Sequence, residues 1–376
     1  MTYLDFAATT PLRPEVLEAM LPYLKEDFGN PSSVHPLGLA AREAIEVARR
    51  QIAGLVDTNA SEVVFTSGAT EANNLAIRGV LVPLLESGTK THAVTTNIEH
   101  PSVAATFQDL VRRGLELTVV DAGNDGVVKA EDVLAAIKPE TALVSMMRVN
   151  NELGTIQPVE KIASGIKATG SKALLHSDAV QSPASLHTSV RELGTDLMSL
   201  SAHKLGGPKG IGALIVRKGL KLAPNVTGGG QEHGLRSGTE NVAAIVGFGV
   251  ASGLAKPVHE YSALNAALDA SLAASGGIAK RLVATEFVAP HITALEVPGA
   301  DADFLVLLLG RENIMLSAGS ACHAGSRDAS KVLLAIGLQE KRARSVIRIS
   351  FGASTTVNDI DIFVAALKKI LPKARP

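Results

Sequence analysis

Two side chains in one stretch of the sequence are suited to chemistry on a flat, electron-poor ring. Asp178 ends the apolar run LLHSD, and Lys204 follows the next apolar run, LMSLSAHK. The two residues are 26 apart (204 − 178), about the length of a strand, a connection and a second strand. Because neighbouring parallel strands end at the same edge of a sheet, we expect both side chains to meet at that edge.

Pyridoxal phosphate (PLP) is the cofactor that fits this pair of side chains. It needs a lysine for its Schiff base and an acid beside its pyridinium nitrogen. The same residues are also consistent with a surface lysine in a glycine-rich turn and an aspartate that caps a helix. The choice between these interpretations depends on the rest of the chain.

Small and hydroxyl-bearing residues offer a site for the phosphate. The motif SGATE at 67–71 follows an apolar run and opens an expected helix. Free N–H groups at a helix start bind anions, and the Thr70 hydroxyl can add to them. Ser201 and His203 flank the lysine and can reach the same group. An ordinary helix cap and a glycine-rich hairpin are the alternatives, and the sequence contains no GxxxxGK[ST] motif and no GxGxxG motif that opens an early helix.

Polar side chains also follow other expected strands. His100 lies after the run HAVTT, where an imidazole can stack on a ring or carry a proton. Asn150, Asn151 and Gln181 offer amides for a ring oxygen or a carboxylate. A capping histidine and turn-forming amides are the alternatives.

Side chains later in the chain add a thiol, a hydroxyl and two cations. In the glycine-rich segment 228–239, Arg236 and Thr239 can close a phosphate site, or the segment is an exposed loop. Cys322 lies among small residues in LSAGSACHAGS, and a thiol on such a loop can travel to a substrate. His323 can lower the pKa of that thiol, although an inert cysteine is the simpler interpretation. Arg348, alone in an apolar strand, can bind a carboxylate in a bidentate manner or face solvent.

Composition limits the class of protein. The chain has 376 residues, with 36 Lys plus Arg against 37 Asp plus Glu. This balance gives no reason to expect nucleic acid as a partner. One cysteine excludes an internal disulfide, and we expect no signal peptide, no membrane span, no metal site and a cytoplasmic location.

Apolar runs that alternate with helical patterns predict an α/β fold with a mostly parallel sheet. The composition changes after the glycine-rich segment, and later strands and helices suggest a smaller α+β domain. We therefore expect a large PLP-binding domain at 14–256, and a small domain at 1–13 and 257–376 that carries the Cys322 loop.

Ten motifs, in this order, cover nearly the whole chain. They are YLDFAATTP, FGNPSS, FTSGATEANNLAI, EH at 99–100, VNNELG, SDAVQ, SAHKLGGPKGIGAL, GGGQEHGLRSGTEN, SAGSACHAG and IRISFG. Together they resemble the cysteine desulfurases, in the class-V aminotransferase-like branch of the fold-type I PLP enzymes. The resemblance implies conversion of L-cysteine to L-alanine, with the sulfur transferred to Cys322 as a persulfide.

The resemblance also implies residue roles and partners. Lys204 is similar to the Schiff-base lysine, and His100 to the ring-stacking histidine that moves protons. The implied catalytic residues are Lys204, Cys322 and His100. Those implied to bind the cofactor are Ala69, Thr70, His100, Asn151, Asp178, Gln181, Ser201, His203, Lys204 and Thr239. Those implied to bind the substrate are Arg348, Asn151 and Asn30. Thr239 matches a residue that reaches the phosphate of the other subunit, which implies a homodimer, and a protein acceptor would take the sulfur for iron–sulfur clusters or thiolation.

Some positions depart from commoner versions of these motifs. His233 stands where arginine is frequent, and Arg148 where histidine is often found. A histidine after the cysteine, here His323, also occurs in selenocysteine lyases. A selenocysteine lyase or another PLP-dependent β-eliminating lyase, and more distantly a non-catalytic scaffold with this fold, are therefore alternatives.

Overall fold

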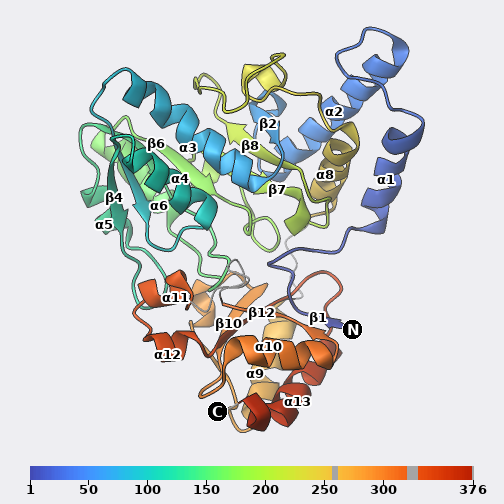
Figure 1. Ribbon diagram of the computed structural model, residues 1–376, viewed down its shortest axis with the longest axis vertical. Helices are drawn as coiled ribbons and strands as arrows, with labels where there is room; N and C mark the ends of the chain where they lie inside the picture. Colours follow the sequence, from blue (N-terminus) through green and yellow to red (C-terminus); the bar gives the residue numbers. More distant parts are fainter. Residues whose placement is uncertain (256–260, 320–328, 375–376) are drawn as a thin grey trace.

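Runs of consecutive buried residues build a seven-stranded sheet in the upper part of the molecule (Figure 1). The computed structural model describes residues 1–255, 261–319 and 329–374. The strand order is β2-β8-β7-β6-β5-β3-β4, and only β8 runs antiparallel to its neighbours. The strands are β2 (Val63–Thr66), β3 (His92–Thr96), β4 (Glu116–Val120), β5 (Thr141–Ser145), β6 (Leu174–Asp178), β7 (Leu197–Ser201) and β8 (Gly212–Val216).

Helices cover both faces of this sheet because successive strand residues point to opposite sides. Val63 and Phe65 of β2 pack with apolar residues of α2 (Pro36–Leu55), α6 (Val159–Thr169) and α8 (Val242–Leu254). Val64, between them, packs with α3 (Ala69–Glu86) and α4 (Pro101–Val111) on the other face. The remaining helices of this part are α1 (Pro14–Lys25), α5 (Ala130–Ala135) and α7 (Val190–Leu193), with short 3₁₀ turns at η1 (Ala60–Glu62), η2 (Ala202–Lys204) and η3 (Glu232–Gly234).

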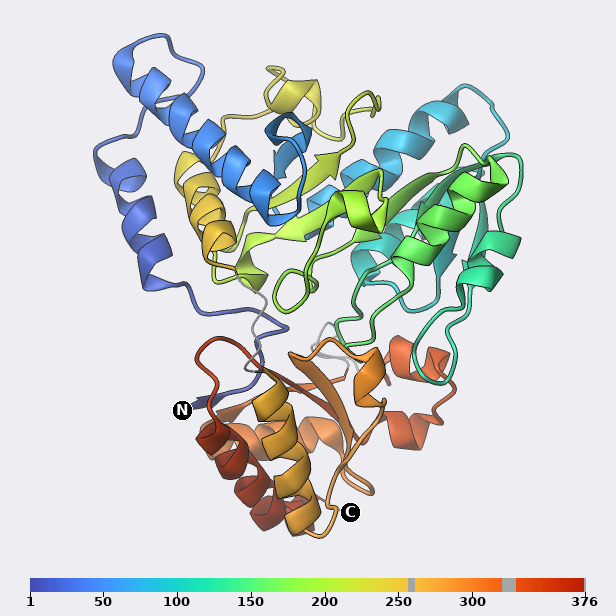
Figure 2. The same ribbon diagram turned by 180° about the vertical axis from the view of Figure 1, so that it is seen from behind.

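The lower part, seen from behind in Figure 2, has its own sheet and core. Its four strands have the order β12-β13-β10-β9 and are antiparallel. They are β9 (Lys280–Arg281), β10 (Ile292–Glu296), β12 (Ser317–Ala318) and β13 (Val346–Ser350). The helices are α9 (Tyr261–Ala274), α10 (Ala302–Arg311), α11 (Lys331–Ala335), α12 (Glu340–Ala343) and α13 (Val357–Ala374), and η4 (Thr285–Phe287) is a 3₁₀ turn.

The predicted α/β class and mostly parallel sheet are confirmed. The seven-stranded and four-stranded sheets are separate, and each has its own apolar core. The boundary predicted at 256 falls in 256–260, outside the described residues, so the division itself stays a prediction.

The first residues of the chain connect the two parts. β1 (Thr2–Tyr3) pairs in parallel with β11 (Ile314–Met315) of the lower part. Leu4 O then accepts from Ser350 N at 2.8 Å. A few residues later, Thr10 N donates to His203 O in the upper part at 2.9 Å. The segment between these contacts therefore crosses from one sheet to the other.

Two glycines allow the turn before α3 to lie against β8. Gly68 has φ +151°, a conformation that side-chain-bearing residues rarely adopt. A Cβ built on Gly212 would lie 2.7 Å from the Cα of Gly68, closer than two carbon atoms pack. Only a glycine at position 212 lets the start of α3 approach the sheet this closely.

We expect Gly212→Ala to lower the free energy of unfolding by about 1–3 kcal/mol, because the added methyl forces the backbone at Gly68 to move. Gly54→Ala is the matched control, since a Cβ there meets nothing within 4 Å and Gly54 lies inside α2. That change should raise stability by roughly 0.5–1 kcal/mol. Urea unfolding of both variants measures the difference, and equal stability of the two would contradict the close approach.

Candidate functional site

A cavity of about 570 Å³ lies at the carboxyl ends of the central strands. Its wall includes the turn before α3, the loops after β6 and β7, and Arg348 of β13. Of the residues predicted from the sequence to form the site, those that line it are Ala69, Thr70, His100, Asn151, Asp178, Gln181, Ser201, His203, Lys204 and Arg348. Residues separated by nearly 300 positions thus share one space.

Two predicted residues that the structure describes are not part of this wall, and a third lies outside the described residues. Asn30 and Thr239 are exposed and do not line the cavity. The Asn30 side-chain oxygen accepts from Ser32 N at 2.9 Å, within its own loop. Cys322 lies in 320–328, outside the described residues. The roles predicted for these three stay predictions.

The predicted meeting of Asp178 and Lys204 rests on the pairing of β6 with β7. The strands are parallel, with Asp178 opposite Ser199, and Lys204 follows in η2. The Asp178 carboxylate is buried and accepts from Asn73 Nδ2 at 2.7 Å and from Val180 N at 3.1 Å. An acid held by these donors in a buried position can stabilise a cationic ring nitrogen.

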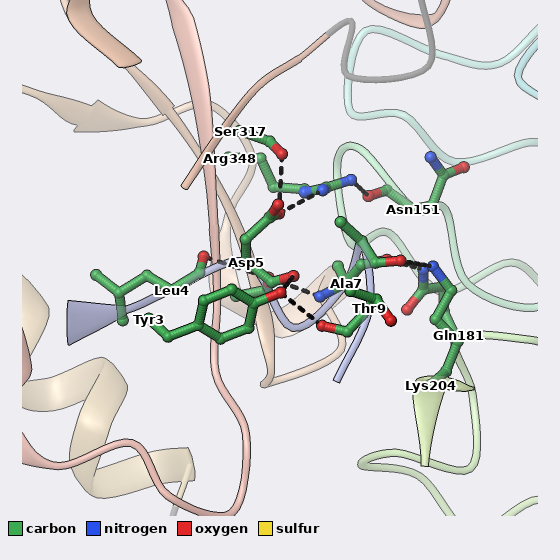
Figure 3. A network of polar contacts seen from close by, with 12 residues as sticks. Tyr3, Leu4, Asp5, Ala7, Thr9, Asn151, Gln181, Lys204, Ser317 and Arg348 are labelled. Atoms are coloured by element: carbon green, nitrogen blue, oxygen red, sulfur yellow. Dashed lines mark hydrogen bonds and ion pairs between the residues drawn. The ribbon is translucent and has the colours of Figure 1, made fainter. Parts of the chain in front are cut away.

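The Lys204 ammonium is held by the N-terminal segment (Figure 3). Its Nζ donates to Ala7 O at 2.5 Å and to Ala8 O at 2.8 Å. Gln181 Nε2 donates to the same Ala7 carbonyl at 2.9 Å. The ends of β6 and β7 are therefore tied to one backbone acceptor.

Arg348 is buried in the wall of the cavity, with 4% of its surface exposed. Its Nη2 lies 2.8 Å from Asp5 Oδ1, and its Nη1 donates to Asn151 O at 2.7 Å (Figure 3). The Ser317 hydroxyl donates to the same Asp5 oxygen at 2.8 Å. The Nε of Arg348 is buried and has no hydrogen-bond partner among the described residues. A buried cation with N–H groups to spare is suited to a carboxylate ligand.

The opposite wall of the cavity offers donors for an anion. The hydroxyls of Thr70 and Ser201 line it, and neither makes a hydrogen bond to any described residue. His203 Nδ1 lies 3.1 Å from Thr9 Oγ1, and burial lowers its pKa to about 4, with Lys204 and Lys209 acting in the same direction. With the first N–H groups of α3, these donors form a cradle for a phosphate.

This arrangement fits PLP. An acid for the ring nitrogen, a lysine and a phosphate cradle surround one cavity, and the hydroxyls that the phosphate would engage have no other described partner. Arg236, which the sequence offered as a further phosphate ligand, instead pairs with Glu71 at 3.0 Å.

His100 combines two of the interpretations that the sequence left open. It lines the cavity and also caps α4, where its Nδ1 accepts from Ser102 N at 3.1 Å. Burial lowers the pKa of His100, and the Lys204 cation acts in the same direction while Asp178 opposes it. His100 is therefore neutral near pH 7.

Two acids near the cavity, the buried Glu99 and the half-buried Glu152, were not singled out from the sequence. Glu99 Oε1 accepts from Thr96 Oγ1 at 2.7 Å and from Met147 N at 3.0 Å, and burial raises the pKa of Glu99 to about 8. Glu152 accepts from the Ser330 hydroxyl, and burial raises its pKa to about 7. Glu99 and Glu152 stand inside the motifs EH and VNNELG, but neither motif shows the contacts that the acid makes.

Sequence reasoning also missed Asp5, Asn73 and the Ala7 carbonyl. Asp5 and Asn73 stand inside the motifs YLDFAATTP and FTSGATEANNLAI, so their positions were visible but their partners were not. Of the unusual motif positions, Arg148 pairs with Glu160 at 2.6 Å. His233 is exposed with φ +58°, and nothing in the structure explains the histidine there.

Comparison with known proteins gives one consistent family. Residues 2–363 match the family model described as Aminotransferase class-V. The chain is 40% identical to "Cysteine desulfurase IscS" of Dictyoglomus turgidum, with 99% of this chain and 95% of that protein covered.

Solved structures of similar proteins match this chain over most of its length. A "NifS-like protein" is 35% identical with a TM-score of 0.91, covering 99% of both chains. A structure titled "SspA in complex with cysteine" is 37% identical with a TM-score of 0.84, covering 95% of this chain and 100% of that one.

We expect Glu99→Gln to change how stability depends on pH. A carboxyl with a raised pKa keeps its proton in the folded state after the unfolded chain, with a pKa of 4.5, has lost it. Stability therefore falls as pH rises between about 4.5 and about 8. Glutamine keeps the two hydrogen bonds to its oxygen but does not titrate.

From about pH 5.5 to about pH 7.5 the wild type should lose up to about 2.7 kcal/mol relative to the variant. Urea unfolding at both pH values measures this, with the exposed Glu131→Gln as control. A constant difference between wild type and Glu99→Gln across this range would show that Glu99 is ionised in the fold.

Proposed function

This chain belongs to the cysteine desulfurase family of the class-V aminotransferases, and on that premise we propose that it converts L-cysteine to L-alanine and takes the sulfur as a persulfide on Cys322. One observation supports the proposal above all. Asp178, Lys204 and the buried Arg348 border a single cavity, so the residues proposed to hold PLP lie beside the residue proposed to bind an amino-acid carboxylate.

Each part of the cavity has a role in this proposal. Asp178 would keep the ring nitrogen protonated, and Gln181 and Asn151 would contact the oxygen edge of the ring. Ala69, Thr70, Ser201 and His203 would hold the phosphate. Lys204 would carry the cofactor. PLP, when bound, withdraws electrons from the substrate Cα.

Substrate binding depends on Arg348. Its guanidinium is held by Asp5 and by the Asn151 carbonyl, so it need not reorganise to meet the α-carboxylate of cysteine. Asn151 and Asn30 are further carboxylate ligands in the proposal. His100 would stack on the ring and handle protons.

Sulfur transfer requires a nucleophile, and Cys322 is the single cysteine of the chain. Its thiolate would attack the sulfur of the bound substrate. A sulfur–sulfur bond forms as the Cβ–S bond breaks, and the electron pair stays with carbon, which is then protonated to give alanine. A protein acceptor, such as a scaffold or sulfur carrier, would collect the persulfide sulfur for iron–sulfur clusters or thiolation.

We also propose a homodimer. Exposed apolar side chains gather on α1 and the loop after it, including Leu24 at 60%, Phe28 at 72% and Val34 at 85%. Such a surface is typical of an interface. Thr239 is exposed and outside its own cavity, which suits a residue that reaches the phosphate of the partner subunit.

The location in the cell is proposed to be the cytoplasm. In the described residues no helix is both long and apolar enough to cross a bilayer. Neither nucleic acid nor membrane is part of the proposal.

We expect Cys322→Ala to abolish release of sulfide and alanine from L-cysteine with a reductant, because the nucleophile is gone, while the absorbance of bound PLP remains. The wild type should release sulfide and alanine in equal amounts. Full activity of Cys322→Ala would refute the persulfide step.

Other products of the same assay distinguish the alternatives. Pyruvate with ammonia would indicate β-elimination, and turnover of L-selenocysteine in place of L-cysteine would indicate a selenocysteine lyase. A protein with no PLP absorbance after addition of the cofactor would instead be a scaffold.

We expect Phe28→Asp to convert a dimer into monomers, because it places a charge in the apolar patch. The matched control is Ile362→Asp, an exposed apolar residue of α13 in the lower part, which should leave the dimer intact. Sedimentation velocity measures the mass of each. A wild type that sediments as a monomer would contradict the proposal.

A further inference from the structure

A chain of hydrogen bonds runs behind the cavity from Asp178 to His100. Asn73 Nδ2 donates to Asp178 Oδ2 at 2.7 Å and to Ser102 Oγ at 2.8 Å. Ser102 Oγ lies 2.8 Å from His100 Nδ1. Asn73 is fully buried, so water does not substitute for these partners. The cap of α4 needs only the hydrogen bond from the Ser102 N–H to His100. It therefore does not explain the hydrogen bonds that the Asn73 amide and the Ser102 hydroxyl make.

The chemistry of the partners indicates which group donates and which accepts in each of these hydrogen bonds. A carboxylate accepts hydrogen bonds and does not donate, so Asp178 fixes the Asn73 amide with its NH₂ group toward the acid. The second hydrogen of that NH₂ group points to Ser102 Oγ. The Ser102 hydroxyl thus accepts from Asn73, and its own hydrogen remains available to donate to His100 Nδ1.

A second donor acts on the same ring nitrogen. The backbone N–H of Ser102 also points to His100 Nδ1, at 3.1 Å. With two donors directed at it, Nδ1 carries a lone pair, and in the neutral ring the proton is on Nε2. His100 Nε2 makes no hydrogen bond to any residue that the structure describes, and the imidazole lines the cavity.

We propose that Asn73 and Ser102 are positioning residues that hold His100 as the neutral Nε2–H tautomer and join its orientation to that of Asp178. This inference rests on the proposed function, because it assigns a chemical role to His100 within that site. In this state His100 directs its Nε2–H toward the cavity, while Nδ1 faces Ser102.

Protonation of His100 is opposed by the same contacts. A second proton must bind at Nδ1, so the Ser102 hydroxyl would have to rotate away from its donating position and the backbone bond would be lost. Two charged groups face the imidazole: Asp178 favours the second proton and Lys204 opposes it. The hydrogen bonds from Ser102 thus oppose protonation of His100 in the same direction as the Lys204 cation.

Ser102→Ala removes one donor and keeps the backbone N–H, and alanine is well tolerated in a helix. The pKa of His100 should rise by about 0.4 to 1 unit, which corresponds to one hydrogen bond. Ser102→Thr should restore the original value. We expect Asn73→Ala to raise the pKa as well, because the Ser102 hydroxyl is then no longer oriented by Asn73 and turns more easily to accept from an Nδ1–H.

The measurement is ¹⁵N NMR of histidine-labelled, PLP-loaded enzyme as a function of pH, with the His100 signals assigned from a His100→Gln variant. The wild type should show a protonated Nε2 and an unprotonated Nδ1. The control is Asn74→Ala, the same residue type one position along α3, which should leave the His100 signals unchanged.

A wild-type His100 with its proton on Nδ1 would overturn the proposal. So would an unchanged pKa in Ser102→Ala, or an equal effect of Asn74→Ala and Asn73→Ala. The kcat of Ser102→Ala should fall about 2- to 10-fold with KM unchanged. The NMR measurement does not depend on turnover. Failure to release sulfide from cysteine would therefore refute the proposed function, while the NMR spectra would still show which nitrogen of His100 carries the proton.

Discussion

The parallel pairing of β6 with β7 is the constraint on which the rest of the site depends. It places Asp178 opposite Ser199 and so determines where the chain turns into η2 and Lys204. A shift in register would break the buried contacts of His176, whose Nδ1 lies 2.8 Å from Ser145 Oγ and whose Nε2 lies 3.0 Å from Ser199 Oγ, and is disfavoured. The helix α3 completes the arrangement, because glycines at positions 68 and 212 let its first turn approach the sheet. The acid, the amine and the anion cradle thus have positions fixed by packing.

The N-terminal segment holds the other side chains of the site in position, largely through its backbone groups. The Ala7 carbonyl accepts from Lys204 and Gln181, while the Ala7 N–H donates to Ser350 Oγ at 2.8 Å. Asp5 pairs with Arg348, whose burial would be costly without an opposite charge. Hydrogen bonds to charged groups contribute about 1.5–3 kcal/mol each. A few residues therefore fix the position of the Arg348 guanidinium relative to the Lys204 ammonium.

The family, the fold class and most of the residues of the cavity wall could be predicted from the sequence, because they depend on local patterns. Apolar runs predicted the strands of the large sheet, and polar residues at their ends predicted the side chains that line the cavity. Asp5 and Asn73 were missed because their partners, Arg348 and Asp178, are distant in the sequence. The Ala7 carbonyl has no side-chain signal at all. Asn30 and Thr239 lie outside the wall, so their predicted roles stay predictions.

The crossing of the N-terminal segment between the two sheets has a consequence for the order of folding. The large sheet uses only residues 63–216, so it can form while the ribosome is still adding later residues. Leu4, in contrast, needs Met315 and Ser350 as backbone partners. The segment around Leu4 is therefore made long before its partners and is placed after them. Contacts of such long sequence separation form slowly, and a nascent chain must keep this segment from pairing elsewhere until Met315 and Ser350 have been made.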